Sequence, residues 1–163
     1  MSDSVPFLLK LMSAIGCGLV AGVFFAFSSF VMTALSRLPA AQGIAAMQSI
    51  NVVVINVSFM ALLFGTAAIC LAVGVWSAVT WHRPGSAIAL TGVAIYLVGT
   101  IGTTIALNVP RNDQLAQVDP THPASEVIWE TYLHEWTRAN HLRTAAALGA
   151  AVLLTLSLTR GAD

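Results

Sequence analysis

One face of a predicted helix gathers the side chains best suited to chemistry. At 100° per residue, an arc of roughly 80° on a helix holds two indoles, a phenol, an amide and a guanidinium. These side chains belong to Trp129, Tyr132, Trp136, Asn140 and Arg143. Tryptophan and tyrosine at helical spacing also occur in ordinary packing and in the aromatic belt of membrane proteins. The pattern therefore leaves packing and binding open for Trp129 and Tyr132.

Arg143 is the strongest single candidate for a functional residue. Its guanidinium has five donors and a permanent charge, and it lies at the edge of an uncharged segment from Thr144 to Thr159. An ionisable group in such a place is costly and indicates a function or a specific partner. The candidate partners are Asp113 and the polar turn predicted at residues 108–112. A structural clamp between that turn and the last helix, and a functional site, both remain open.

Carboxamide side chains gather near the same predicted membrane face. Burying an amide costs free energy unless the amide is hydrogen-bonded. A group of amides therefore predicts either a polar network that joins the helices or a polar cavity. The group consists of Gln48, Asn51, Asn56, Asn108, Asn112 and Asn140.

A second face of the same helix carries charged residues at i, i+4 spacing, which is typical of a solvated surface. This face holds Glu130, His134, Arg138 and His141. His134 and His141 are two turns apart, about 10 Å along the helix axis, which is too far for one metal ion. Glu130 with His134 is the best remaining pair for a surface metal site, and we interpret it as solvated.

The sequence gives no other indication of a metal or an organic cofactor. A transition-metal site needs three or four converging ligands. Cys17 and Cys70 lie in separate apolar segments, and His82 is predicted on the opposite side of the membrane from the other histidines. The chain also lacks a glycine-rich phosphate loop. We therefore expect no cofactor and no bound metal.

The composition places these residues in a membrane protein. Of the 163 residues, 57% are hydrophobic and 9% are charged, whereas about 25% of the residues of a soluble domain are charged. Seven Lys and Arg balance seven Asp and Glu, so there is no basic surplus for nucleic acid. We expect contact with membrane lipid and no nucleic-acid partner.

Long uncharged runs predict an all-α protein, a four-helix transmembrane bundle in a single domain over residues 1–163. A span needs about 20 apolar residues, and the runs place the spans near 7–34, 50–79, 86–107 and 139–159. Residues 108–138 would form a polar loop and the start of a last helix over residues 124–159. That helix would be about 54 Å long and would project from the membrane. Four spans put both termini on one side, and the charges leave the orientation undetermined.

Small residues recur every four positions in the first span, at Ala14, Gly18, Gly22 and Ala26. Such a stripe lets a second helix approach closely in lipid. The partner is either another helix of the same chain or a second copy in a homo-oligomer, and both alternatives remain open.

Taken together, these blocks resemble the anthrone oxygenase-like family of small four-helix membrane proteins, long catalogued as a domain of unknown function. The resemblance extends over nearly the whole chain. It depends on a glycine-rich start, two amide-containing blocks and the last helix. The matching residues are Gly18 to Phe27, Ala46 to Asn51, Asn108 to Asp113 with Leu115, and Trp129, Trp136, Asn140 and Arg143.

The resemblance implies a cofactor-independent monooxygenase acting on a lipophilic aromatic or phenolic ketone. Removal of one proton from the acidic methylene of such a ketone gives an enolate that can pass an electron to O₂ directly. The protein then has to supply an apolar slot, a base and donors for the oxyanion. The alternative is a non-catalytic membrane protein that binds or carries a lipophilic molecule, or a structural partner subunit.

The resemblance also implies residue roles. We expect the substrate to contact Trp129, Tyr132, Trp136, Gln48, Asn51 and Asn108. We expect Arg143, Asn140 and Asn112 to hold the oxyanion, with Asp113 or a bound water as the base. His141 is a weaker candidate for the base, because it lies off the aromatic stripe.

Overall fold

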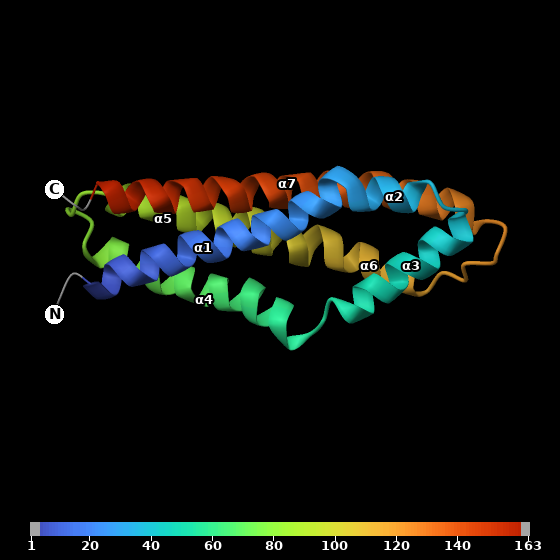
Figure 1. Cartoon of the computed structure of the whole chain (residues 1–163), viewed down its shortest axis with the longest axis horizontal. Coiled ribbons are helices and arrows are strands. Elements are labelled where there is room, and N and C mark those ends of the chain that lie inside the picture. Colours follow the sequence, from blue (N-terminus) through green and yellow to red (C-terminus); the bar gives the residue numbers. More distant parts are fainter. Residues whose placement is uncertain (1–3, 161–163) are drawn as a thin grey trace.

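A computed structural model of the chain describes residues 4–160, and within them every regular element is helical. Figure 1 shows an elongated bundle in which the start of α1 and the end of α7 lie at the same end. The elements are α1 (Ser4–Ala26), η1 (Phe27–Val31), α2 (Met32–Ser36), α3 (Ala40–Val53), α4 (Val57–Val79), α5 (Ser86–Ala94), η2 (Ile95–Gly102), η3 (Thr104–Asn108), α6 (Val109–Ala116) and α7 (Ser125–Thr159). The three η elements are π-helical turns inside longer helices.

The predicted bundle of four membrane-spanning helices is confirmed. Four helices among the described residues are long and apolar enough to span a membrane, over 4–36, 57–79, 86–116 and 125–159. At 1.5 Å per residue, the 35 residues of α7 are about 52 Å long. A bilayer core is about 30 Å thick, so this helix exceeds it, as the sequence predicts. The helices over 4–36 and 86–116 exceed it as well.

The second span begins later than predicted. The sequence predicts a helix from residue 50, but α3 ends at Val53 and a bend separates it from α4. Asn56 caps both helices: its Oδ1 accepts the Phe59 N–H at 3.0 Å, and its Nδ2 donates to the Val53 carbonyl at 2.9 Å. Because one side chain satisfies these groups, an apolar segment bends without leaving them unpaired. Asn56 is exposed and is a local cap, not part of the predicted amide group.

The third span ends later than predicted. Residues 108–112 are helical, and the helix continues to Ala116, where the sequence predicts a turn around Pro110. The wider turn of η3 comes directly before Pro110, which has no N–H to donate and needs space on its N-terminal side. The guanidinium of Arg111 donates to the Leu107 carbonyl at 2.6 Å. Proline is therefore accommodated inside the helix.

The loop between α6 and α7 is short and held by its own side chains. Asp119 Oδ1 accepts the Thr121 N–H at 2.9 Å and the Thr121 hydroxyl at 2.8 Å, and these bonds hold the pKa of the Asp119 carboxyl below its ordinary value. Ser125 donates to the Asp119 carbonyl at 2.6 Å, where α7 begins.

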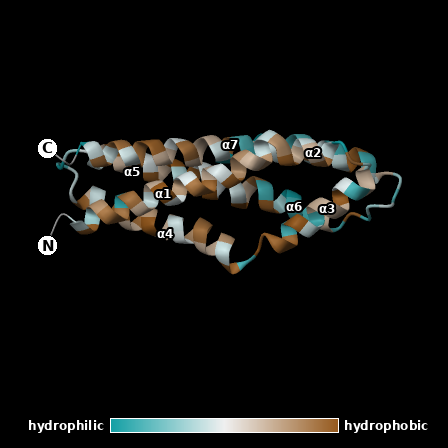
Figure 2. Cartoon of the chain, viewed as in Figure 1, coloured by the Kyte–Doolittle hydropathy of each residue, from teal (hydrophilic) through white to brown (hydrophobic). Residues whose placement is uncertain are grey.

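The buried side chains form two apolar clusters along the bundle. The first cluster lies among α1, α4, α5 with η2, and α7, and it includes Cys17, Val20, Cys70, Tyr96 and Leu154. The second lies among α2, α3, α6 and the first half of α7. We call this part the lobe, and its cluster contains Met32, Leu35, Ile44, Met47, Leu115, Trp129, Tyr132 and Trp136. Figure 2 shows the hydrophilic residues gathered around α6, while α1 and α4 are mostly hydrophobic.

The two glycines of the small-residue stripe of α1 do not make the close contacts within the chain that its intrachain interpretation requires. A Cβ atom placed on Gly18 or Gly22 would meet nothing within 4 Å. α1 instead approaches α4 closely on a different face, at Gly16, where an added Cβ atom would lie 2.9 Å from Thr66 Cγ2. Of the stripe, Ala14 belongs to the first apolar cluster. A homo-oligomer formed through this stripe stays a prediction.

Candidate functional site

A polar layer separates the two apolar clusters. Its side chains come from η1, η2, η3 and α7, and hydrogen bonds join them. They are Ser28, Thr100, Thr104, Asn140, Arg143 and Thr144. π-Helical turns contribute Ser28, Thr100 and Thr104. Such turns are rare and frequently mark functional positions.

Arg143 occupies the centre of this layer and is 5% exposed. Its NH2 group donates to Asn140 Oδ1 at 2.7 Å, and its NH1 group donates to Thr104 Oγ1 at 3.4 Å. The guanidinium carbon lies 4.2 Å from the centre of the Phe24 ring and 5.1 Å from that of Trp136. These two rings stabilise the cation through their electron-rich faces.

The guanidinium has no carboxylate partner among residues 4–160. Its Nε atom is buried and makes no hydrogen bond. A buried cation without an anion leaves an excess of positive charge inside the protein, which favours negative charge nearby. The layer is therefore suited to stabilising an anion.

Asn140 connects Arg143 to Ser28. While its Oδ1 accepts from Arg143, its Nδ2 donates to the Phe24 carbonyl at 2.7 Å and to Ser28 Oγ at 2.8 Å. Every polar atom of this amide thus has a protein partner, which fixes its orientation. Thr144 Oγ1 lies 3.3 Å from Ser28 Oγ and donates to the Asn140 carbonyl at 2.9 Å.

The predicted aromatic stripe is present and buried. Trp129 stacks on Tyr132 with ring centres 5.7 Å apart, and Tyr132 stacks on Trp136 at 6.3 Å. Asn112 Oδ1 accepts from the Tyr132 hydroxyl at 2.9 Å and from Trp136 Nε1 at 2.8 Å. Phe27 packs against Trp136 at 5.6 Å. The three rings of α7 therefore stack in a row, Phe27 packs at a tilt against the last of them, and Asn112 orients Tyr132 and Trp136 from α6.

The remaining predicted amides join helices in the lobe. Gln48 Nε2 donates to the Leu115 and Val118 carbonyls, each at 2.9 Å, and so caps the end of α6. Asn108 Nδ2 donates to the Trp136 carbonyl at 3.3 Å. Of the two alternatives for the amides, these two residues therefore follow the first, a polar network that joins helices.

Three further buried polar atoms in this region have no partner. They are Asn51 Nδ2, Asn108 Oδ1 and Trp129 Nε1. Together with Arg143 Nε, they retain hydrogen-bonding capacity inside the lobe and the polar layer. The structure therefore brings most of the predicted site residues together, and it leaves polar atoms of several of them without protein partners.

Asp113 lies apart from this arrangement. Its side chain is exposed on α6, and no hydrogen bond or ion pair joins it to Arg143. Of the two partners predicted for Arg143, neither Asp113 nor the segment over residues 108–112 bonds to its guanidinium, which donates to Asn140 and Thr104 instead. Consecutive positions on a helix point in different directions, so Asn112 faces α7 and Asp113 does not. The ion pair between α6 and α7 joins Arg111 to Glu135 at 3.0 Å.

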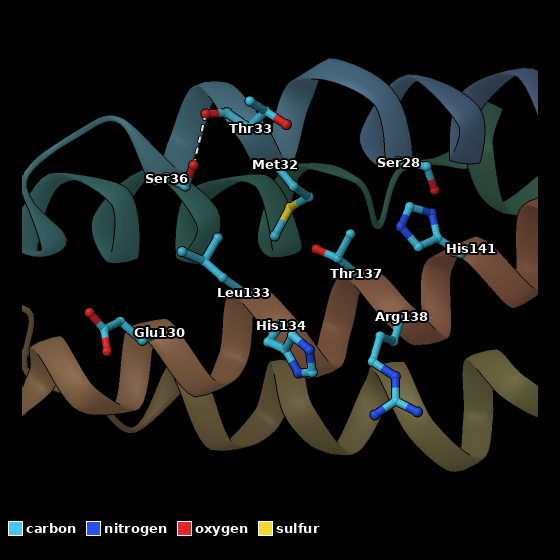
Figure 3. A pocket seen from close by; sticks show the side chains of 10 residues that line it. All are labelled: Ser28, Met32, Thr33, Ser36, Glu130, Leu133, His134, Thr137, Arg138 and His141. Atoms are coloured by element: carbon cyan, nitrogen blue, oxygen red, sulfur yellow. Dashed lines mark hydrogen bonds between the residues drawn. The ribbon is translucent and has the colours of Figure 1, made fainter.

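An open groove of about 550 Å³ lies beside the polar layer, between the end of the first helix and α7 (Figure 3). The predicted charged face of α7 forms one wall, and η1 and α2 form the other. The lining residues are Ser28, Met32, Thr33, Ser36, Glu130, Leu133, His134, Thr137, Arg138 and His141. The sequence correctly predicts a solvated face, but it does not show that residues 28–36 cover that face to form a groove.

Ser28 is the site residue that the sequence missed, and His141 is one that the sequence offered only as a weaker candidate for the base. Both line the groove, and Ser28 also contacts Asn140 in the polar layer. His141 comes from the position directly after Asn140, and Figure 3 shows its ring on the same side of α7 as Ser28. Nothing in the sequence pairs residue 28 with residue 141, because that proximity arises from the packing of α1 on α7.

Among residues 4–160, no three His, Cys, Asp or Glu side chains lie close enough together to hold a metal ion. The expectation that the protein uses no metal and no organic cofactor stays a prediction.

The fold and the site define a helical membrane protein with a buried cationic layer beside an open polar groove. The sequence model of the anthrone oxygenase family matches residues 56–153, more than half of the chain. The chain therefore belongs to the anthrone oxygenase family, as the resemblance predicted. The matched range contains Asn108, Asn140 and Arg143 but not Gln48, Asn51 or the wall over residues 28–36. No curated protein and no solved structure matches the chain.

Proposed function

We propose that this protein is a cofactor-independent oxygenase that uses O₂ to convert the acidic methylene of a lipophilic polycyclic ketone into a carbonyl. Membership of the family supports the reaction class. The structural observation that carries the proposal is Ser28, which lines the groove and bonds to the amide that holds Arg143. Through Ser28 and Asn140, a negative charge on a ligand in the groove is thereby coupled to the buried guanidinium of Arg143.

The reaction balances without a further reductant. A base removes one proton from the methylene, and the electron pair of the C–H bond moves into the ring system as an enolate. The enolate passes one electron to O₂, and the resulting radical and superoxide combine to form a C–O bond. The peroxide takes up a proton, and loss of water from it leaves the new carbonyl. One O₂ is consumed, and one water and one quinone are produced.

His141 is the base in this proposal. The groove offers His134, His141 and Glu130 as proton acceptors, and His141 lies next to Asn140 in the sequence. Histidine is the side chain most often used for proton transfer near neutral pH. Asp113, which the sequence offered as the base with a bound water as the alternative, is exposed and does not line the groove.

Ser28 donates to the oxyanion that forms when the proton leaves. Its oxygen accepts from Asn140, so its own hydrogen is directed elsewhere. Without substrate, the Ser28 hydroxyl donates to Thr144 Oγ1 over a long distance of 3.3 Å. The charged oxygen of the substrate is a stronger acceptor and takes the place of Thr144 Oγ1. Arg143 donates to Asn140, which donates to Ser28, and this chain makes the Ser28 hydroxyl a stronger donor because aligned hydrogen bonds polarise one another. In this role Asn140 and Arg143 are positioning residues.

The groove suits a flat molecule that is partly apolar. Met32 and Leu133 provide apolar surface, while Thr33, Thr137 and Ser36 provide hydroxyl groups for the polar edge of the substrate. The groove lies beside a membrane-spanning segment, so a lipophilic ketone can enter from the lipid.

Oxygen uptake by the purified protein with an anthrone tests the proposal. We expect one O₂ to be consumed for each quinone formed. Ser28→Ala should reduce kcat/KM by about 10²–10³-fold, as loss of one oxyanion donor does. His141→Gln should reduce it by about 10²–10⁴-fold. His122→Gln, in the exposed loop before α7, is the matched control and should retain full activity.

Two results would contradict the proposal. Full activity in both groove variants would remove Ser28 and His141 from the mechanism. Binding of the anthrone without O₂ uptake would identify the protein as a carrier of lipophilic molecules, which is the alternative function.

A further inference from the structure

The groove beside the polar layer has two ends that differ in chemistry (Figure 3). Ser28 and His141 lie at one end, and the carboxylate of Glu130 lies at the other. Glu130 and His141 are both on α7, and the 11 positions between them correspond to about 16 Å along the helix axis. The groove is therefore long enough to hold a second part of the substrate, away from the reacting carbon.

The end near Ser28 presents a donor and positive charge. In the proposed reaction the Ser28 hydroxyl donates to the oxygen of the ketone, and Arg143 acts on Ser28 through Asn140. Arg138 also lines the groove, three positions before His141. This end therefore suits the part of a substrate that accepts hydrogen bonds and becomes negatively charged.

The end near Glu130 presents acceptors instead. Glu130 is exposed, and among residues 4–160 its carboxylate makes no hydrogen bond and no ion pair, even with His134 one turn away. Figure 3 shows Ser36, on the opposite wall, toward the same end. The Ser36 hydroxyl donates to the Thr33 carbonyl at 2.9 Å, so its oxygen can only accept from a ligand. This end therefore requires a hydrogen-bond donor on the substrate.

We propose that Glu130 selects polycyclic ketones that carry a hydroxyl group on a terminal ring, remote from the reacting methylene. The hydroxyl donates to the Glu130 carboxylate while the ketone oxygen accepts from Ser28. In the reversed orientation the oxyanion would form beside the Glu130 carboxylate, and like charges in contact repel each other. Glu130 thus determines both which ketone binds and which way round it lies.

This inference rests on the proposed function, because the reaction at Ser28 and His141 defines the direction of the substrate. It adds a residue that takes no part in proton transfer and acts on the choice of substrate. Because Glu130 is exposed and unpaired among the described residues, its replacement leaves the packing of α7 unchanged.

A matched pair of ketones tests the assignment. Two anthrones that differ only in one terminal-ring substituent, hydroxyl or methoxy, are compared in oxygen uptake and, without O₂, in binding measured by calorimetry. We expect the wild-type protein to favour the hydroxyl compound by about tenfold in both Kd and kcat/KM, which is the size of one hydrogen bond to a charged acceptor that water can reach.

Two replacements of Glu130 separate its charge from its acceptor oxygens. Glu130→Gln keeps a neutral acceptor and should lower the preference to about threefold, because hydrogen bonds to neutral acceptors are weaker. Glu130→Met has no acceptor and should remove the preference. Both variants should bind and oxidise the methoxy compound as the wild type does. Glu126→Gln is the matched control: Glu126 lies one turn earlier on α7, is exposed and does not line the groove, so the tenfold preference should remain.

The outcomes distinguish this assignment from the oxygenase reaction. A tenfold preference that persists in Glu130→Met, or an equal loss for both ketones in that variant, would overturn the role of Glu130. Oxygen uptake by the wild type without any preference would overturn it as well and leave the reaction intact. A binding preference that depends on Glu130, without oxygen uptake, would overturn the reaction alone. Failure of both ketones to bind would overturn both proposals.

Discussion

Replacing Arg143 by Lys separates the charge of this residue from its shape. Lysine keeps a positive charge in the polar layer but has no planar fork of donors. The guanidinium spans Asn140 and Thr104 while it faces the Phe24 and Trp136 rings. A single ammonium group cannot maintain all of these contacts at once.

The contacts set the size of the expected effect. The 2.7 Å hydrogen bond from Arg143 to Asn140 involves a charged donor, and such bonds contribute about 1.5–3 kcal/mol. Each ring contact adds about 0.5–2 kcal/mol. If the substituted lysine keeps about half of these contacts, the free energy of unfolding falls by about 1–3 kcal/mol. A loss of the same size in the transition state lowers kcat/KM by about 10–100-fold.

Arg143→Met provides the comparison that separates folding from function. Methionine removes the buried charge, which is costly without an anion, but it leaves Asn140 Oδ1 without its donor. We expect Arg143→Met to lose less stability than Arg143→Lys and to lose more activity. A structural clamp would instead make stability and activity fall together in both variants.

Two measurements on each variant distinguish a structural clamp from a functional role of Arg143. Unfolding in mixed micelles gives the change in stability, and oxygen uptake with an anthrone gives kcat/KM. Full activity in Arg143→Lys, with wild-type stability, would refute the role of the guanidinium in orienting Asn140 and Ser28.

Two further predictions concern the helices that carry the site. Gly16→Ala should lower the free energy of unfolding by about 1–3 kcal/mol, because the new methyl group overlaps Thr66. Gly18→Ala, whose methyl group meets open space, should leave it unchanged or raise it, because alanine favours the helix more than glycine does, and equal losses in the two variants would contradict the packing of α1 on α4. Asn56→Ala should cost about 1 kcal/mol in the same assay through loss of the cap on α4. Asn56→Asp keeps the acceptor for Phe59 N–H and should recover most of that loss, unless the bend depends mainly on the bond to Val53.

The glycine comparison also bears on the stripe of small residues in α1. A Cβ atom on Gly18 or Gly22 would meet nothing within 4 Å among residues 4–160, so close packing against another described helix does not explain these two glycines. Crosslinking of cysteines placed at these two positions would test whether the stripe joins two copies of the protein. The spacing of small residues alone cannot distinguish these cases, since it shows which face of a helix is smooth and not what lies against it.

The sequence by itself determined the fold class. Long uncharged segments have to be helical in lipid, because only a helix satisfies all of its backbone groups within one segment. It also determined the aromatic face of α7, since the 100° rotation per residue fixes which of its side chains share a side. Trp129, Tyr132, Trp136, Asn140 and Arg143 are all buried on that face. The family resemblance depended on four blocks of sequence, and the matched range, 56–153, contains the block over residues 108–115 and the last helix but not the two earlier blocks.

Tertiary structure alone decided where the helices bend and what faces each functional side chain. The bend at Asn56 depends on two hydrogen bonds inside an apolar run, and hydropathy does not register them. The helical path through Pro110 depends on a π-helical turn that propensities do not predict. Ser28 reaches Asn140 across 112 positions of sequence because α1 packs along α7. Periodicity describes one helix at a time, whereas the groove and the polar layer exist only between helices.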